Sequence, residues 1–351
     1  MNGNSSGLVI GMPAGSLADP KRGGNLVSLL KAAGFPTRGY EDGGPTTFPL
    51  HAELIGWDGR PQEFGAQLAL DELDLAIGGD DWITERLLEY RYEYGKEVTL
   101  NKVLSLNRGS VRIVAVCRPI ENGMDFNTWL KGLLNQGGLI RMVSEMPYLG
   151  VEWFLKKAAT LGVDPATIPY AVQKYGAPPR IDRGLVVYES WGKTESKIAN
   201  GAVDLGLEIT QTGSAIRNYG LYIAETIMHS ETGVWASPLL REHPEKRELA
   251  RMFLLNLYGA VFAENKALLL FNIKREQAEA AQRYLQENGL FGDEPTINEG
   301  KHYMEFSVQV DLSRSDLPVA RVRYELARLG ATHIETIPLN SCIPSLNVIN
   351  L

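Results

Sequence analysis

The chain has 351 residues, of which 44% are hydrophobic and 22% are charged, and its formal net charge is −7. This length and composition predict two or three globular domains and exclude a largely disordered or low-complexity chain. The acidic balance argues against a general nucleic-acid surface, which needs clustered Lys and Arg. Anionic ligands must then be met locally, by backbone amides, helix N-termini and a few arginines.

No apolar run approaches the roughly 20 residues of a membrane-spanning helix. The start, MNGNSSGLVIGMPAGSL, lacks the basic region and long apolar stretch of a signal peptide, so we expect a cytoplasmic protein with no membrane partner. The only cysteines, Cys117 and Cys342, form neither a disulfide framework nor a metal cluster. The histidines have no ligand spacing on a helix or strand, which argues against a histidine metal site. They are His51, His229, His243, His302 and His333.

Strands and helices alternate over the first two thirds of the chain, which predicts α/β lobes with mainly parallel sheets. The first series has strands at Leu8–Met12, Ala52–Ile55 and Leu73–Gly78 and helices at Asn25–Ala33, Pro61–Asp71 and Asp81–Tyr90. The second has helices at Phe126–Leu134, Gly150–Leu161 and Thr194–Ala199 and strands at Leu139–Ser144, Leu185–Glu189 and Val203–Ile209. Between them, two apolar runs, Lys102–Leu106 and Val111–Val116, are separated by Asn-Arg-Gly-Ser, so we expect a short hinge at Asn107–Ser110.

The pattern changes after an apolar strand at Tyr222–Trp235 and a long helix at Leu240–Glu264. The C-terminal elements are strand Ala267–Ile273, helix Arg275–Gln286, strand His302–Val310, helix Leu317–Leu329 and strand Thr332–Leu339. This order suits a ferredoxin-like module, and such modules often regulate or assemble the proteins that carry them. We therefore expect a first lobe over 1–108 and 215–264, a second lobe over 109–214, and a ferredoxin-like domain over 265–351.

One segment, Glu208-Ile-Thr-Gln-Thr-Gly-Ser-Ala-Ile-Arg-Asn-Tyr-Gly220, carries the strongest chemical signal. An apolar strand ends there in Thr212, Gly213 and Ser214, and a helix follows. Glycine lets a backbone approach a phosphate, while helix amides and hydroxyls donate hydrogen bonds to it. Glu208 is placed to accept hydrogen bonds from ribose hydroxyls beside that phosphate, which together describe a phosphoribosyl group. An ordinary helix N-cap is the competing interpretation of the same residues.

The same region resembles the long, regulated form of ATP phosphoribosyltransferase, which opens histidine biosynthesis. The resemblance rests on the motifs Ser190-Trp-Gly-Lys-Thr-Glu195, Thr210-Gln-Thr-Gly-Ser-Ala-Ile-Arg217 and Gly220-Leu-Tyr-Ile-Ala-Glu-Thr-Ile-Met-His-Ser230. Met12-Pro-Ala-Gly-Ser-Leu17, Arg60-Pro-Gln-Glu63, Leu73-Asp-Leu-Ala-Ile-Gly-Gly-Asp-Asp-Trp-Ile83 and Gly330-Ala-Thr-His-Ile-Glu-Thr-Ile-Pro-Leu339 look like further landmarks of that family. The resemblance implies two lobes of the type-II periplasmic-binding-protein kind and a C-terminal ferredoxin-like (ACT-like) domain.

The resemblance also implies where 5-phosphoribosyl-1-pyrophosphate (PRPP) would bind. Its 5-phosphate would lie on Thr212, Gly213 and Ser214, its ribose on Glu208, and Glu195 would sit beside the ribose or a Mg²⁺ ion. Gly15 and Ser16 would form the opposite wall. Arg60 is a candidate contact for the pyrophosphate or the acceptor's phosphates, Lys193 for phosphate charge, and Trp191 for a base. A packing role for Trp191 is the alternative.

Two departures from the family pattern affect the expected acceptor. Ala14 stands where the family usually has a lysine, which removes a charge that two polyanionic substrates would need. Ala215 replaces a second hydroxyl residue of the phosphate site and deletes one donor. In addition, the segment Glu294–His302 is shorter than the family's usual loop, which leaves histidine feedback open. Arg112 and Arg118 would face the cleft or the surface, and Asp80 and Asp81 would be N-cap charges of the following helix.

These observations predict a Mg²⁺-dependent phosphoribosyltransferase that joins PRPP to a ring nitrogen and releases pyrophosphate, with ATP as the acceptor typical of the family. One alternative is a divergent relative that couples PRPP to another heterocyclic base in a specialised pathway. Another is a non-catalytic small-molecule-binding regulatory protein. The family's habits further imply a homo-oligomer.

Overall fold

The computed structural model describes residues 7–14, 25–40, 47–51, 53–290 and 296–351. The chain divides into two compact units. One contains Met1–Val27, Thr37–Ala250 and Leu351, and the other contains Ser28–Pro36 and Arg251–Asn350. Within the described residues, every helix is too short or too polar to cross a membrane.

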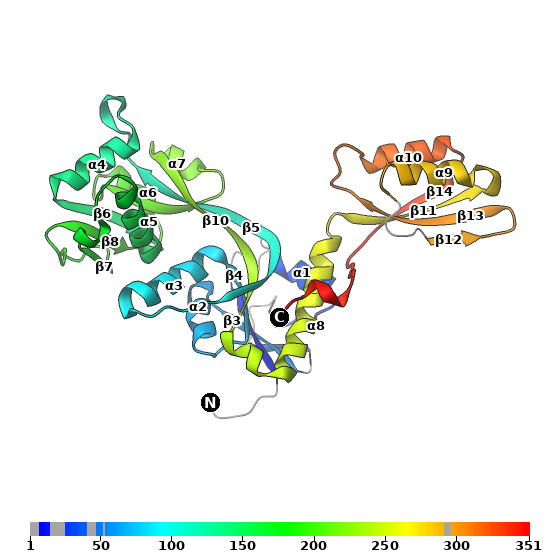
Figure 1. Cartoon of the computed structure of the whole chain (residues 1–351), viewed down its shortest axis with the longest axis horizontal. Coiled ribbons are helices and arrows are strands. Elements are labelled where there is room, and N and C mark those ends of the chain that lie inside the picture. The colour runs from blue at the N-terminus through cyan, green and yellow to red at the C-terminus, as the bar shows by residue number, and fades with distance from the viewer. Residues whose placement is uncertain (1–6, 15–24, 41–46, 52, 291–295) are drawn as a thin grey trace. The chain divides into compact units, whose positions relative to one another are not determined.

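The larger unit is built on one ten-stranded sheet with the order β2-β3-β1-β4-β10-β5-β9-β6-β8-β7 (Figure 1). Its strands are β1 (Leu8–Pro13), β2 (Thr47–His51), β3 (Leu54–Gly59), β4 (Leu75–Gly79), β5 (Asn101–Cys117), β6 (Leu139–Ser144), β7 (Tyr170–Lys174), β8 (Gly184–Glu189), β9 (Leu205–Thr210) and β10 (Tyr222–Ala236). The helices before the C-terminal strands are α1 (Leu26–Ala32), α2 (Pro61–Ala69), α3 (Asp80–Tyr94), α4 (Phe126–Gln136), α5 (Pro147–Thr160), α6 (Thr194–Ala199), α7 (Ser214–Asn218) and α8 (Pro244–Ala263).

Each half of this sheet has a parallel core, in which β1 pairs with β3 and β4, and β6 pairs with β8 and β9. The long strands β5 and β10 join the halves. They pair antiparallel with each other, while β10 also pairs with β4 and β5 with β9. The predicted α/β architecture of two lobes is confirmed, and the two lobes share a continuous hydrogen-bonded sheet.

The predicted hinge at Asn107–Ser110 is part of a strand, so the expectation of two separate runs was wrong. The register moves from Thr232 opposite Arg108 to Gly233 opposite Ser105, which leaves extra residues of β5 as a bulge. Asn107 and Gly109 carry this irregularity with positive φ angles of 51° and 64°. A bulge bends and twists a strand without ending it, which is why the polar Asn-Arg-Gly-Ser sequence looked like a loop.

Local sequence signals explain the helix ends around this sheet. The Asp125 side chain caps α4 by accepting the backbone N–H of Thr128, and Gly137 closes that helix with φ of 67°. Pro61 begins α2 and Gly95 closes α3 in the left-handed region. The caps agree with the predicted positions of these helices to within a few residues.

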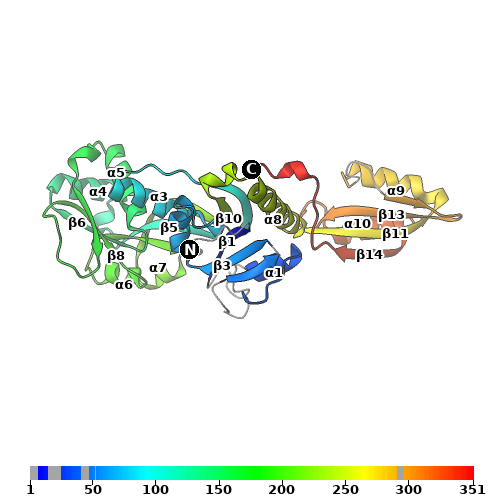
Figure 2. The same cartoon turned by 90° about the horizontal axis from the view of Figure 1, so that it is seen from below.

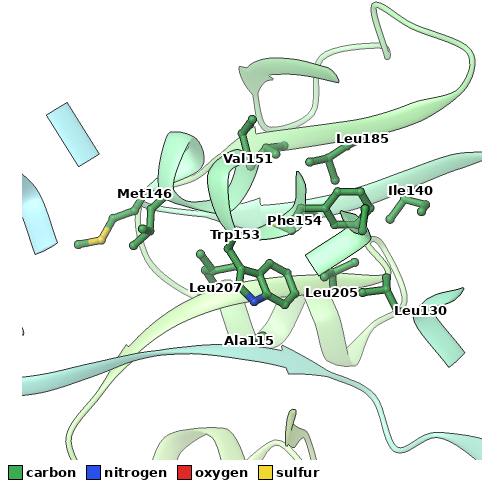
Figure 3. Close-up of a cluster of buried hydrophobic side chains, with 14 of the residues drawn as sticks. Ala115, Leu130, Ile140, Met146, Val151, Trp153, Phe154, Leu185, Leu205 and Leu207 are labelled. Atoms are coloured by element: carbon green, nitrogen blue, oxygen red, sulfur yellow. The ribbon is translucent and has the colours of Figure 1, made fainter. Parts of the chain in front are cut away.

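A cluster of buried hydrophobic side chains lies in the second half of the sheet, between its strands and helices α4 and α5 (Figure 3). Phe154 and Trp153 of α5 pack over Leu205 and Leu207 of β9, and Phe154 is fully buried. Burial of one such aromatic side chain stabilises the fold by roughly 1.5–3 kcal/mol. This core fixes the strand ends that carry the site residues.

The smaller unit contains a four-stranded antiparallel sheet with the order β12-β13-β11-β14 (Figure 1 and Figure 2). Its elements are β11 (Lys266–Lys274), α9 (Arg275–Glu287), β12 (Thr296–Glu299), β13 (Tyr303–Asp311), α10 (Val319–Arg328) and β14 (Thr332–Pro338). Alternate residues of β11, from Ala267 to Ile273, are buried with residues of both helices. The βαββαβ order and the strand arrangement confirm the predicted ferredoxin-like domain, and β12 completes it. This unit also includes the second half of α8, and the predicted domain limits of 108, 214 and 264 stay predictions.

Candidate active site

A cavity of about 640 Å³ lies in the larger unit. Its walls come from the start of α2, the junction of β4 with α3, the paired strands β5 and β10, and the turn before α6. Arg60 and Ala14 line one part of it, and both are exposed. The volume is in the range of small-molecule sites.

Two tryptophans face each other in this cavity. Trp82, in the first turn of α3, stacks on Trp191, with ring centroids 6.0 Å apart and planes inclined by 12°. Both indoles line the cavity, and Trp191 remains 60% exposed. An exposed indole in a cavity wall is typical of a binding surface more than of a packed core. The pairing supports the base-binding interpretation of Trp191 and adds Trp82, which the sequence alone did not single out.

Asp81 is a buried carboxyl group in the cavity wall, and its neighbour Asp80 forms an ion pair with Lys102. Its Oδ1 accepts the backbone N–H of Trp82 at 2.9 Å, and its own N–H donates to the Ser230 hydroxyl at 3.1 Å. Burial raises the pKa of the Asp81 carboxyl group. Its hydrogen bonds with the backbone N–H of Trp82 and with the Ser230 side chain lower that pKa, but by less. The predicted N-cap role of Asp80 and Asp81 is wrong, because Gly79 is the N-cap residue.

Gly79 is required by this arrangement. A Cβ atom at Gly79 would lie 2.2 Å from Asp81 Oδ1 and 3.4 Å from the Ser230 hydroxyl. Any side chain there would push the Asp81 carboxyl group out of its place. The glycine therefore allows a carboxyl group to lie directly behind the end of β4.

Glu208 and Glu195 form a second polar group at the end of β9 and the first turn of α6. Burial, and then the charge of Glu195, raises the pKa of Glu208 to about 7, while a hydrogen bond from the buried Thr194 hydroxyl lowers it. Glu145 adds a smaller repulsion and itself accepts the N–H of Gly192 at 2.7 Å. Carboxyl groups from three places in the chain are thus brought together, and the charges of Glu195 and Glu145 raise the pKa of Glu208.

The predicted phosphate cradle is a tight turn directly after β9. Gly213 has φ of 74°, and its N–H donates to the Thr210 hydroxyl at 2.8 Å. The hydroxyl oxygens of Thr212 and Ser214 lie 2.8 Å apart at the start of α7. A Cβ atom at Gly213 would lie 2.9 Å from Ile223 Cδ1, so both the backbone angle and the space favour glycine.

Arg217 adds a cation to this turn, although from the sequence it stood out only as part of a motif. Its guanidinium donates to the Thr212 carbonyl oxygen at 2.9 Å and to the Ser214 hydroxyl at 3.4 Å. Arg217 follows Ser214 by three residues, a spacing that places two side chains on one face of a helix. This spacing was the signal in the sequence from which Arg217 could have been assigned to the cradle.

The predicted site residues lie in different places. Trp191 and Arg60 line the cavity, whereas Glu195, Glu208 and the cradle residues do not. Lys193 adopts a left-handed conformation with φ of 54° before α6, and its side chain is exposed. Gly15 and Ser16 lie outside the described residues.

The sequence matches a protein-family model described as ATP phosphoribosyltransferase over residues 60–257, more than half of the chain. The chain belongs to the ATP phosphoribosyltransferase family. It is therefore an enzyme of the phosphoribosyltransferase class, and the matched segment contains the cavity walls contributed by α3 and β10, both glutamates and the cradle.

Curated relatives agree over nearly the full length. An ATP phosphoribosyltransferase of Trichlorobacter lovleyi is 26% identical over 97% of this chain and 100% of its own sequence. ATP phosphoribosyltransferase 1 of Geobacter sulfurreducens is 27% identical over 96% of this chain and 100% of its own sequence. A solved ATP phosphoribosyl transferase complex from Thermotoga maritima is 19% identical over 71% of this chain and 96% of that chain, with a TM-score of 0.49.

Proposed function

We propose that this enzyme transfers the phosphoribosyl group of PRPP to a ring nitrogen of a heterocyclic acceptor and releases pyrophosphate. The acceptor typical of the family is ATP, in the first step of histidine biosynthesis. The observation that carries the proposal is the close succession of Glu208 and the Thr212–Ser214 cradle at the end of one strand.

The cradle suits the 5-phosphate of PRPP. Gly213 supplies the left-handed backbone angle of the turn, and the hydroxyls of Thr212 and Ser214 are exposed donors. Arg217 supplies a guanidinium within reach of the same turn, and charge-assisted bonds from arginine to phosphate are among the strongest hydrogen bonds in proteins. Together these groups would bind a dianion that the net negative charge of the chain otherwise repels.

Glu208 and Glu195 suit the ribose. An ionised carboxylate accepts hydrogen bonds from hydroxyl groups and stabilises the positive charge that develops on the sugar ring as the bond to pyrophosphate breaks. The acceptor nitrogen attacks C1 with its own lone pair, so the reaction needs orientation of two substrates and no protein nucleophile. Two carboxylates beside a phosphate cradle are sufficient for that chemistry.

A Mg²⁺ ion fits this site only with the substrate's help. Within the described part of the chain, no three His, Cys, Asp or Glu residues are grouped to hold a metal. Mg²⁺ commonly takes one or two protein carboxylates and completes its octahedron with phosphate oxygens and water, so Glu195 with bound PRPP would suffice. The ion would neutralise charge on the departing pyrophosphate.

A divergent acceptor is the second candidate, because Ala14 is an exposed, uncharged residue of the cavity wall. The family-typical lysine would be a point charge for phosphates at this place. Among the described residues, Arg60 is the cation that lines the cavity. A less charged heterocycle than ATP would fit such a wall.

The test is to incubate the full chain with PRPP, Mg²⁺ and either ATP or a panel of free bases, and to follow pyrophosphate release and product mass. Release with ATP supports the histidine-pathway reaction, and release only with another base supports the divergent transferase. No release with any acceptor, together with no PRPP binding by calorimetry, contradicts the proposal. Light scattering on the same sample tests the expected homo-oligomer.

A further inference from the structure

A second cavity, of about 460 Å³, lies in the larger unit apart from the candidate active site. It is bordered by α3, α5 and β10, and α3 and α5 lie side by side (Figure 1 and Figure 2). Among the described residues, this cavity and the first one share no lining residue. Its volume is within the range of small-molecule sites, so the larger unit offers room for a second ligand.

An apolar surface forms part of the wall of the second cavity. Leu88 of α3 and Leu149 of α5 contribute to it and are buried, and Ile227 and Met228 of β10 are partly buried. Side chains of this kind offer a ligand van der Waals contact over a broad area and select apolar groups. This part of the wall therefore suits a hydrocarbon or aromatic group of a ligand.

Glu225 of β10 adds a carboxylate to the wall. One of its oxygens accepts the indole N–H of Trp153, and the other accepts from Lys157 at 2.6 Å. The Glu225 side chain is still 31% exposed. A carboxylate can accept about four hydrogen bonds, so two bonds hold this group in place and leave it able to accept from a ligand.

Lys156 of α5 adds a cation that can turn to a ligand. Its ammonium group lies 2.6 Å from Glu152, one helical turn earlier, while its side chain is 74% exposed. Exposed pairs of this kind contribute little to stability. Glu152 also accepts the Tyr92 hydroxyl and lies 3.6 Å from Arg91, so it retains partners when Lys156 leaves it.

The charges that line the second cavity are balanced. Lys156 pairs with Glu152 and Lys157 with Glu225, so the lining carries two charges of each sign. A ligand with a single charge would add an uncompensated charge to this wall, whereas a ligand with one charge of each sign would not. The wall therefore selects a zwitterion over a simple acid or a simple amine.

We propose that the second cavity binds an α-amino acid with an apolar side chain. That side chain lies against Leu88, Ile227 and Met228. The ammonium group donates to Glu225, and the carboxylate accepts from Lys156. The ligand thereby bridges α3 of the first lobe and α5 of the second. This inference does not depend on the proposed function, because the site lies outside the first cavity and the cradle.

The probe is L-phenylalanine, because each of its three features can be removed alone. Hydrocinnamate lacks the ammonium group, phenethylamine lacks the carboxylate, and L-serine lacks the apolar side chain. We expect L-phenylalanine to bind the full chain in calorimetry and to raise the midpoint of thermal unfolding, because a ligand of the folded state stabilises it. Each of the other compounds should bind at least about tenfold more weakly, since each loses a charged hydrogen bond or the apolar contact.

Two variants assign the binding to this cavity. Lys156→Met removes the ammonium group and should lower the affinity for L-phenylalanine about tenfold while leaving that for phenethylamine unchanged. Glu225→Gln keeps the shape of the side chain and should weaken the binding of L-phenylalanine without weakening that of hydrocinnamate. Lys131→Met, in the exposed part of α4, removes a lysine that does not line the cavity and is the control. Thermal unfolding without ligand checks that each variant is folded.

An absence of L-phenylalanine binding, or an affinity that is unchanged in Lys156→Met and Glu225→Gln, would overturn the inference. An equal loss in Lys131→Met would overturn it too, because it would show a general effect of charge. These measurements contain no PRPP and no acceptor. Pyrophosphate release therefore tests the transferase proposal separately, and either proposal can fail while the other stands.

Discussion

The carboxyl group of Glu85 in α3 accepts the backbone N–H of Leu149 at 2.7 Å, and its second oxygen accepts the N–H of Tyr148 at 3.0 Å. Glu85 therefore satisfies two amides in the first turn of α5, a helix that begins with Pro147 and has no side-chain cap of its own. One buried side chain of the first lobe thus completes a helix of the second.

Glu85 should make the stability of the larger unit depend on pH. Burial, and to a lesser extent the charge of Glu89, raises the pKa of Glu85 to about 8. The hydrogen bonds from the two backbone N–H groups and the charge of Arg86 lower it, but by less. Between the ordinary carboxyl pKa and pH 8 the folded protein retains a proton that the unfolded chain has lost. Stability then falls as pH rises through that window, by at most about 1.4 kcal/mol per pH unit.

Glu85→Gln is neutral at every pH, so we expect it to flatten this dependence in urea unfolding followed by tryptophan fluorescence from pH 5 to 8.5. The exposed Glu279→Gln, in the smaller unit, is the control and should leave the slope unchanged. A wild-type slope equal to that of Glu85→Gln would contradict the raised pKa.

Glu208 should set the acidic limb of the activity profile. Because the ionised form is the one that stabilises the transition state, kcat/KM should rise with pH through about 7. Glu195→Gln removes a repulsive charge and should move the limb to lower pH, even where the rate itself drops. Thr194→Val removes a stabilising hydrogen bond and should move it to higher pH. If the acidic limb of kcat/KM lies at the same pH in the wild type, Glu195→Gln and Thr194→Val, the limb does not report the ionisation of Glu208.

Arg217 should contribute to PRPP affinity through the cradle. We expect Arg217→Gln to weaken PRPP binding about tenfold in calorimetry and to make it less sensitive to salt, because one charge-assisted bond to phosphate is lost. Arg283→Gln, on an exposed helix of the smaller unit, serves as the control for a lost arginine. Equal losses in both variants would point to a general charge effect instead of the cradle.

Ala14→Lys should improve the use of polyanionic acceptors. A lysine at this exposed position of the cavity wall adds a point charge near the acceptor's phosphates. The KM for ATP should fall several-fold at low salt, and KM values for uncharged bases should not change. Ala14→Met has a similar length without the charge and should behave like the wild type. An equal effect on ATP and on neutral bases would show that the residue acts through shape.

The features that could be predicted from the sequence are those formed by residues close together in the chain. The cradle is a strand, a glycine turn and a helix in succession, so Thr212, Gly213 and Ser214 were found together. The ferredoxin-like module was recognisable from alternating apolar residues such as those of β11, whereas β12 was missed because its four residues are largely exposed. Short polar strands carry almost no periodic signal.

Contacts between residues that are far apart in the chain could not be predicted from the sequence. Trp82 and Trp191 stack on each other although they are 109 positions apart in the chain. The sequence around neither residue indicates that the other lies nearby. The Thr232 hydroxyl has no hydrogen-bond partner in the part of the chain that the structure describes, and this depends on its surroundings in β10, since threonine in a strand is ordinary. Asp81 looked like a helix cap because its place in the sequence fits one, and only the geometry of Gly79 separates the two roles.

The position of β10 between β4 and β5 also constrains the order in which the protein can assemble during synthesis. Leu75–Gly79 and Asn101–Leu106 reach the same sheet only through a strand that ends at Ala236. A nascent chain that stops before Tyr222 therefore exposes two unpaired strand edges, which are sites of aggregation. The first lobe, although encoded first, is completed late on the ribosome, and a chaperone that shields strand edges would act in that interval.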